Sequence, residues 1–150
     1  MIALDSNIFV YVSDSRFVAK QAAAVGVVET LSRRRAVIGL QTVGETQNVL
    51  LRKLKVPPAD AAAFGVFMLQ SFECASAVPE DAAFALAEMA AGRLSYWDAL
   101  LLSTVARAGC TAMMTEDLQD GATILGVEIV NPFADGGLSE RAQALLGSTA

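Results

Sequence analysis

The sequence predicts an α/β protein, a three-layer α/β/α sandwich built on a short, mostly parallel central sheet. Its 150 residues suit one domain with a sizeable core. Short apolar runs recur along the chain, separated by longer segments that carry apolar residues at helical spacing. The short runs are continuously apolar and do not alternate with polar residues, which is typical of parallel strands covered by helices on both faces.

The expected elements follow one another with few interruptions. Strands are expected at the short apolar runs, residues 1–4, 36–40, 73–78, 110–115 and 127–133. Helices are expected at residues 17–34, 41–54, 58–72, 79–93 and 95–109, with a weak one at 139–146. Residues 116–126 are expected to form a turn and a short helical piece. The main domain should span residues 1–133, with residues 134–150 as a tail of the same domain.

Prolines and glycines support several of these boundaries. Pro57 and Pro58 end the preceding helix, because proline lacks the amide hydrogen that a helix interior needs. Pro58 and Pro79 suit the first turns of the helices that follow them. Gly109 is a typical residue just past the end of a helix.

The composition excludes several classes of function. The chain has no histidine, which rules out Ser-His-Asp and Cys-His catalysis and histidine-ligated zinc. Its net charge of −5 is not that of an obvious nucleic-acid binder. Cys74 and Cys110 lack metal-ligand spacing, so we expect two buried, reduced thiols in a cytoplasmic protein. The N-terminus carries Asp5 and no basic residue, unlike a signal peptide, and the apolar runs are too short to span a membrane.

The helix expected at residues 95–109 places an acid in an apolar setting. From Trp97 onward nearly every residue is apolar, so the helix is expected to be largely buried. Asp98 nonetheless lies in its first turn. Ser95 and Asp98 have the three-residue spacing of a helix cap, and the helix dipole favours a carboxylate at this end. Capping alone would account for Asp98.

Other acids directly follow expected strands. Asp5 follows the first strand, Glu116 and Asp117 follow the fourth, and Glu45 lies in the first half of the helix after the second. The carboxyl ends of parallel strands meet at one edge of a sheet, and the N-terminus of the helix with Asp98 borders the same edge.

Each acid also has a plain structural explanation. Asp5 could be a turn or cap residue, Glu45 a solvated helix residue, and residues 115–121 a polar turn. The coincidence of all of them at one edge favours a shared role, because clustered acids repel one another unless a cation neutralises them. Oxygen ligands favour Mg²⁺ or Mn²⁺ over zinc. The sequence therefore predicts a divalent-cation site.

Four segments, taken in order, resemble the PIN-domain family. They are Leu-Asp-Ser-Asn at 4–7, Glu45, Tyr-Trp-Asp-Ala-Leu-Leu-Leu at 96–102 and Thr-Glu-Asp-Leu-Gln-Asp-Gly at 115–121. The likeness is closest to the VapC-type toxin ribonucleases of bacterial toxin–antitoxin pairs, and it runs from Met1 to about Phe133.

The resemblance implies a metal-dependent endoribonuclease, the toxin of a toxin–antitoxin pair. The four catalytic acids of the family fall on Asp5, Glu45, Asp98 and Asp117. It implies that Asp5, Asp98 and Asp117 hold Mg²⁺, with Mn²⁺ as an alternative. The polar partners of these acids fall on Asn7 and Thr115. Glu116 and Asp120 remain alternatives to Asp117 as the last acid.

The resemblance also implies partners: an RNA substrate, a cognate antitoxin that covers a hydrophobic groove and the acidic site, and a second copy of the chain. Hydrophobic residues make up 54% of the sequence, which fits an additional interface. Candidates for it are Phe64, Phe67, Met68 and Phe72, for which ordinary core packing is an equal explanation. The basic runs 33–35 and 52–55 could contact RNA backbone or could be solvated helix ends.

Two other functions remain open. An acidic α/β phosphatase usually needs a second acid two residues after its nucleophile, where this sequence has Asn7. A non-catalytic PIN-like module that binds RNA or protein would not need all four acids, yet all four are present. Metal-dependent cleavage of RNA distinguishes the ribonuclease from both.

Overall fold

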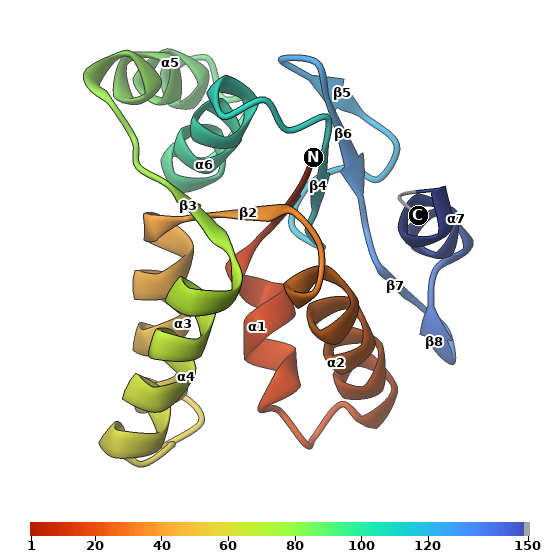
Figure 1. Ribbon diagram of the computed structural model, residues 1–150. Helices are drawn as coiled ribbons and strands as arrows, with labels where there is room; N and C mark the ends of the chain where they lie inside the picture. The colour runs from red at the N-terminus through yellow and green to blue at the C-terminus, as the bar shows by residue number, and fades with distance from the viewer. Residues whose placement is uncertain (149–150) are drawn as a thin grey trace.

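Five parallel strands form the body of the central sheet in the computed structural model, which describes residues 1–148 (Figure 1). The strands of this sheet are β1 (Ile2–Leu4), β2 (Ala36–Gly39), β3 (Glu73–Ala75), β4 (Ala112–Met114), β5 (Thr123–Ile124) and β6 (Val127–Val130). Their order is β3-β2-β1-β4-β6-β5, and β5 at one edge is antiparallel to β6. The predicted mostly parallel sheet is confirmed.

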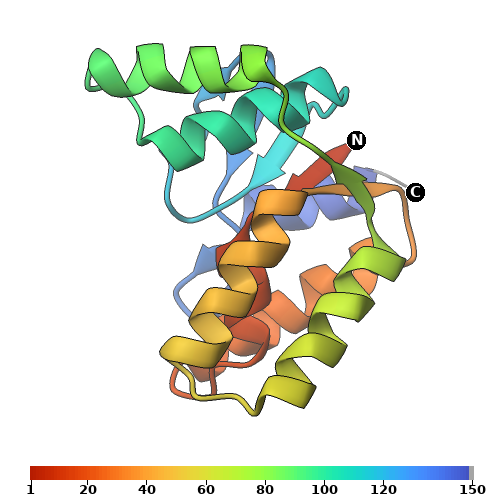
Figure 2. The same ribbon diagram turned by 90° about the vertical axis from the view of Figure 1, so that its left-hand side faces the viewer.

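Seven helices surround this sheet within the described part of the chain. They are α1 (Ser6–Val12), α2 (Val18–Ser32), α3 (Leu40–Arg52), α4 (Pro58–Ser71), α5 (Pro79–Ala90), α6 (Tyr96–Arg107) and α7 (Glu140–Ser148). Figure 2 shows α5 and α6 lying together on one side of the molecule and α3 and α4 on another.

Alternate residues of the strands supply two separate cores, which explains the three layers. Ile2 and Leu4 of β1 face a core shared with α1, α2 and α4. Ala3 between them faces the opposite core, where Leu102 and Val105 of α6 pack. Because successive side chains of a strand point to opposite faces, a strand buried on both faces must be apolar throughout. The predicted α/β/α sandwich is confirmed.

Three local expectations are wrong, and one helix, α1, was not expected from the sequence. Residues 6–12 form α1, which begins directly after β1 because Asp5 caps it. Residues 116–126 contain no helix; they include β5, which joins β6 through Leu125 and Gly126, both at positive φ as a two-residue hairpin turn requires. Cys74 is exposed, because β3 is an edge strand. Trp97 is 58% exposed, because the buried face of α6 begins only at Ala99.

The chain after β6 is more ordered than a tail with one weak helix. Strands β7 (Phe133–Ala134) and β8 (Gly137–Leu138) form a hairpin, and α7 follows. Ala142 of α7 is buried in the same core as α1 and α2. No helix within residues 1–148 is long and apolar enough to cross a membrane.

Candidate active site

The main chain places Asp5 at the carboxyl end of β1, in the middle of the sheet. Its amide donates a hydrogen bond to the carbonyl of Met114 in β4, at 3.1 Å, so the strand pairing extends to this residue. Its carboxylate accepts from the amide of Ser6 at 2.6 Å and caps α1. The Asp5 side chain is only 4% exposed. Asp5 therefore combines a cap with a buried carboxylate in a fixed position.

Asp98 lies in the first turn of α6, and the predicted cap is present. The hydroxyl of Ser95 accepts from the main-chain N–H of Asp98 at 3.1 Å. The cap thus uses the backbone of Asp98 and the side chain of Ser95. The Asp98 carboxylate also interacts with the side chain of Ser95, and one of its oxygens lies near those of Asp5 and Asp117.

Asp5, Asp98 and Asp117 come together from three separate segments of the chain. One carboxylate oxygen from each lies within 4.8 Å of the others. No ion pair within residues 1–148 includes any of the three. Burial, with the charges of Asp117 and Glu45, raises the pKa of Asp5 to about 6 against hydrogen bonds from Thr115 and Ser6. Burial, with the charge of Asp117, also raises the pKa of Asp98 against a hydrogen bond from Ser95.

These residues fit a divalent cation. A cation between the three carboxylates would relieve the repulsion and desolvation that raise the two pKa values. The donor set consists of oxygen atoms alone, which suits Mg²⁺ or Mn²⁺ and not a metal that prefers sulfur or nitrogen. The predicted trio for metal binding is therefore brought together.

Asn7 and Thr115 link the carboxylates to one another. The Asn7 amide nitrogen lies 3.2 Å from an oxygen of Asp5 and 3.0 Å from one of Asp117. The buried Thr115 hydroxyl donates to Asp5 at 2.7 Å and accepts from the amide of Asp117 at 3.1 Å. Both residues lie where the sequence places them, beside the acids, and they fix the orientation of Asp5 and Asp117.

Glu45 lies at the border of the cluster and is not one of the three mutually close acids. Its two oxygens accept from Ser6 Oγ at 3.0 Å and from Gln41 Nε2 at 2.7 Å. Ser6 also lies 3.4 Å from Asp5 through the same hydroxyl. Sequence reasoning missed Ser6 and Gln41. The position of Gln41 one helical turn before Glu45 is the signal that could have found it.

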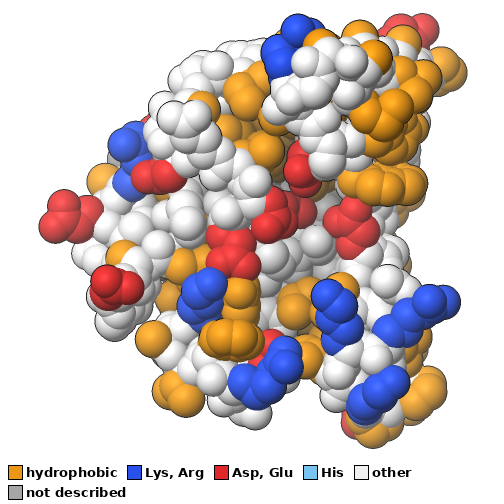
Figure 3. Space-filling model, turned by 180° about the vertical axis from the view of Figure 1, so that it is seen from behind, with side chains coloured by type: hydrophobic (Ala, Val, Ile, Leu, Met, Phe, Trp, Pro, Cys, Tyr) orange, Lys and Arg blue, Asp and Glu red, His pale blue; other side chains and the backbone are white. Residues whose placement is uncertain are grey.

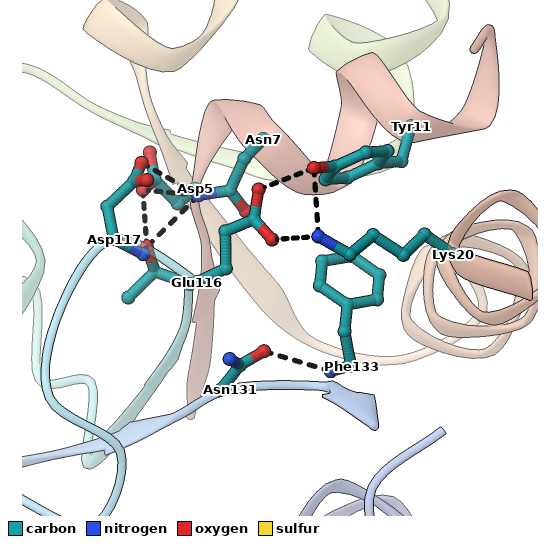
Figure 4. Close-up of polar contacts among 9 residues, drawn as sticks. Asp5, Asn7, Tyr11, Lys20, Glu116, Asp117, Asn131 and Phe133 are labelled. Atoms are coloured by element: carbon teal, nitrogen blue, oxygen red, sulfur yellow. Dashed lines mark hydrogen bonds and ion pairs between the residues drawn. The ribbon is translucent and has the colours of Figure 1, made fainter. Parts of the chain in front are cut away.

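Glu116 and Asp120 have other partners, which separates them from Asp117. In Figure 4, Glu116 points away from Asp5 and towards Tyr11 and Lys20. It accepts from the Tyr11 hydroxyl and the Lys20 ammonium, each at 2.7 Å. Asp120 accepts from the amide of Asn131 at 2.9 Å. Of the three competing acids, Asp117 is the one that faces Asp5 and Asp98.

Tyr11 and Lys20 were not among the candidate residues. The Lys20 ammonium lies 4.7 Å from the centre of the Tyr11 ring and 5.4 Å from that of Phe133. Figure 4 shows Phe133, from the segment after β6, below the Lys20 side chain. No motif in the sequence connects these residues, because they come from α1, α2 and β7.

The two basic runs have different positions. Arg35 directly precedes β2, at the amino ends of the parallel strands, whereas the acids lie at their carboxyl ends. It pairs with Glu73 at 2.6 Å. Lys53, at the end of α3, lines a cleft that also contains Asn7 and Asp117. Among the aromatic candidates for an interface, Phe72 is 6% exposed in the core and Phe67 is 37% exposed.

Comparison with known proteins agrees with this architecture. The family model described as PIN domain matches residues 2–119. VapC20 of Mycobacterium tuberculosis, described as a sarcin-ricin loop cleaving toxin, superposes with a TM-score of 0.61 at 13% identity, over 75% of this chain and 87% of that one. VapBC2 of Rickettsia felis, bound to a DNA fragment from their promoter, gives a TM-score of 0.56 at 15% identity, over 78% and 89%. No curated protein sequence matches the chain significantly.

Proposed function

The chain belongs to the PIN domain family, and from this premise we propose that it is a metal-dependent endoribonuclease and the toxin of a toxin–antitoxin pair. The observation that carries the proposal is the group of three carboxylates whose oxygens lie within 4.8 Å of one another, without a cationic partner in the described residues. We propose Asp5, Asp98 and Asp117 as ligands of Mg²⁺, which Mn²⁺ could replace, and Glu45 as the fourth catalytic acid.

A divalent cation, when bound, supplies a Lewis acid that activates water and stabilises charge on the phosphate undergoing hydrolysis. The residues of the chain prepare the site for it. Asn7 and Thr115 hold the carboxylates of Asp5 and Asp117 in one orientation through hydrogen bonds of 2.7–3.2 Å. Ser6 connects Glu45 to the cluster, so Glu45 is positioned to orient a water molecule.

The partners belong to the same proposal. RNA is the proposed substrate class, in line with the description of VapC20 as a toxin that cleaves the sarcin-ricin loop. An antitoxin protein is the proposed inhibitor, and the likeness to VapBC2 supports it. The active oligomeric state is proposed to be a homodimer, located in the cytoplasm. The exposed Val66, Phe67 and Leu69 of α4 are apolar candidates for a contact with either protein.

Cleavage of a labelled pool of structured RNAs by the purified chain tests the proposal. We expect cleavage with Mg²⁺ or Mn²⁺ and none with EDTA. Asp5→Asn and Asp98→Asn should each lower the rate by more than about 100-fold, because loss of a ligand removes several kcal/mol of transition-state stabilisation. Asp117→Asn should do the same, whereas Asp120→Asn should retain most of the activity. Asp60→Asn, an exposed first-turn acid of α4, is the control.

Two outcomes contradict the proposal. If the folded chain binds Mn²⁺ by calorimetry but cleaves no RNA in the pool, the non-catalytic RNA- or protein-binding module is favoured. If Asp98→Asn cleaves as fast as the parent chain, then Asp98 serves α6 and not the reaction.

A further inference from the structure

A cleft opens directly beside the acidic cluster and extends beyond it along α1. Its volume is about 330 Å³, at the lower end of the range for ligand sites. Asn7 and Asp117 form its inner end, since both belong to the cluster and both line the cleft. From there one side of α1, with Tyr11 one turn after Asn7, leads to the turn that contains Arg16 and Phe17.

The charges in the cleft favour an anion beyond the cluster. Asp14 is paired with Arg16 at 2.8 Å and Glu116 with Lys20 at 2.7 Å, so each pair is neutral overall and the net positive charge here comes from Lys53. Lys53 is exposed, and no ion pair within residues 1–148 includes it. The Arg16 side chain is 68% exposed, and its second terminal nitrogen is not engaged by Asp14. Figure 3 shows lysine and arginine side chains below a central group of acids on one face of the molecule.

An aromatic side chain, Phe17, lies beside Arg16 in the same cleft. Phe17 is 46% exposed and lines the cleft. The Arg16 guanidinium lies over its ring at 5.5 Å, and the Tyr11 ring meets it edge-on at 5.7 Å. Tyr11 is itself held by its hydrogen bond to Glu116. Exposed aromatic rings and guanidinium planes are the surfaces on which unstacked bases of single-stranded RNA stack.

We propose that this cleft is a nucleotide subsite, in which Phe17 stacks on a base next to the cleaved bond and Arg16 and Lys53 contact the flanking phosphates. The inference rests on the proposed function in that RNA is the substrate. Tyr11, Lys20 and Glu116 act as positioning residues: they orient the Phe17 ring and cancel the charge that would otherwise repel phosphate.

Binding of a fluorescein-labelled oligouridylate, followed by fluorescence anisotropy in EDTA and again in Mg²⁺, tests the subsite without depending on cleavage. Phe17→Leu keeps the apolar volume and removes the ring, so we expect affinity to fall about tenfold. Phe17→Trp should retain the affinity. The logarithm of the binding constant falls linearly with the logarithm of the salt concentration. Arg16→Gln and Lys53→Gln should each make this slope shallower by about 0.7, the value for one phosphate contact to a single strand.

Matched controls lie elsewhere on the molecule. Arg35→Gln removes an exposed arginine that is also paired with an acid, at the amino ends of the parallel strands. Phe67→Leu removes an exposed ring from α4, which does not line the cleft. Both should bind as the parent chain does, and thermal melts establish that every variant is folded.

The inference is overturned if folded Phe17→Leu binds as the parent chain does, even if the two cations prove necessary, because the cleft would then contact only phosphate. It is also overturned if the parent chain does not bind the oligouridylate in either medium at low salt. The two proposals fail separately. If the parent chain cleaves no RNA but binds the oligouridylate in a way that depends on Phe17, the proposed nuclease activity is contradicted and the subsite is not. If Phe17→Leu cleaves and binds as the parent chain does, only the subsite is contradicted.

Discussion

At the scale of single residues, the site depends on two adjacent acids that point in different directions. Asp117 faces Asn7 and the acidic cluster, while Glu116 pairs with Lys20, whose side chain is 36% exposed against 22% for Glu116. The pair is more protected from water than Arg35 and Glu73, which are 75% and 48% exposed. Solvent and salt screen a protected pair less. The interaction that holds Glu116 away from the cluster should therefore be stronger than that of an exposed surface pair.

A double-mutant cycle of Lys20→Met and Glu116→Gln should therefore show coupling of about 1 kcal/mol in the free energy of unfolding, with a part from the contact of Lys20 with Tyr11. The same cycle on the exposed pair Arg35 and Glu73 should give a smaller coupling. Urea titrations of the four chains in each cycle measure both values. Equal coupling in the two pairs would show that the environment of Lys20 adds nothing.

The sequence could not choose between Glu116, Asp117 and Asp120, and the reason lies at this scale. The choice is made by partners distant in the chain, since Lys20 is 96 residues from Glu116 and Tyr11 is 105 residues from it. Asp5 and Asp98 have no such close competitors: Asp5 directly follows β1, and Asp98 is the one acid in the first turn of α6.

At the scale of elements, α6 is held in place by a buried carboxylate on α5. Asp81 is 2% exposed and pairs with Arg107 near the end of α6 at 2.8 Å. It also accepts from the amide of Val78 at 2.9 Å and from Ser103 at 2.7 Å. Burial alone would raise the pKa of Asp81, but these hydrogen bonds outweigh it, and the net effect is a pKa below 3.8.

Asp81→Asn should destabilise the protein by about 2 kcal/mol at neutral pH, less than a fully buried pair because Arg107 is half-exposed. Because the pKa of Asp81 is lower in the folded than in the unfolded protein, its ionised carboxylate stabilises the folded state above pH 3.8. This stabilisation is lost as the pH falls through the pKa of Asp81 in the folded protein. The difference between the two chains should therefore shrink in acid. Urea titrations across this range measure it, with Asp60→Asn, the acid in the same position of the first turn of α4, as the control.

Most helices were predictable because apolar spacing and proline or glycine mark their limits. Helix α1 was not, because its seven residues are too few for a helical period and follow β1 without a turn. The β5–β6 hairpin escaped for a different reason: its turn is Leu125-Gly126, and Leu at positive φ is not a residue that a sequence pattern associates with such a turn.

At the scale of the whole molecule, the layer that carries Asp98 meets the sheet at a glycine. A Cβ atom on Gly39, at the end of β2, would lie 2.6 Å from Cδ1 of Leu101. Leu101 is 2% exposed among Val37 and Met113 and cannot move aside without disturbing that core. The close approach of α6 to the sheet thus depends on the absence of one methyl group.

Gly39→Ala should cost about 1–3 kcal/mol of stability through overpacking and should displace α6. Gly26→Ala in α2 is the matched change, because nothing outside the adjoining backbone of that helix and the two neighbouring residues lies within 4 Å of its Cβ position. It should instead stabilise by about 0.5–1 kcal/mol, the usual gain for alanine over glycine inside a helix. Thermal unfolding of both variants gives the comparison, and a stabilised Gly39→Ala would mean that Leu101 has room to move.

The layers and the edge at which the acids meet could be predicted, because continuous apolar strands and acids at strand ends are local features. The strand order β3-β2-β1-β4-β6-β5 and the cleft lined by α1 and α3 could not, because they arise from contacts between distant segments.

The exposed Trp97 gives the chain an optical property. It is the one tryptophan of the sequence; it directly precedes Asp98, its carbonyl accepts from Gln41 at 3.0 Å, and its indole meets the Tyr96 ring at 5.1 Å. Indole fluorescence responds to nearby charge and to the polarity of its surroundings. All tryptophan emission from this protein therefore originates beside the acidic cluster. The intrinsic fluorescence of an unlabelled sample should change when an ion or an oligonucleotide binds there.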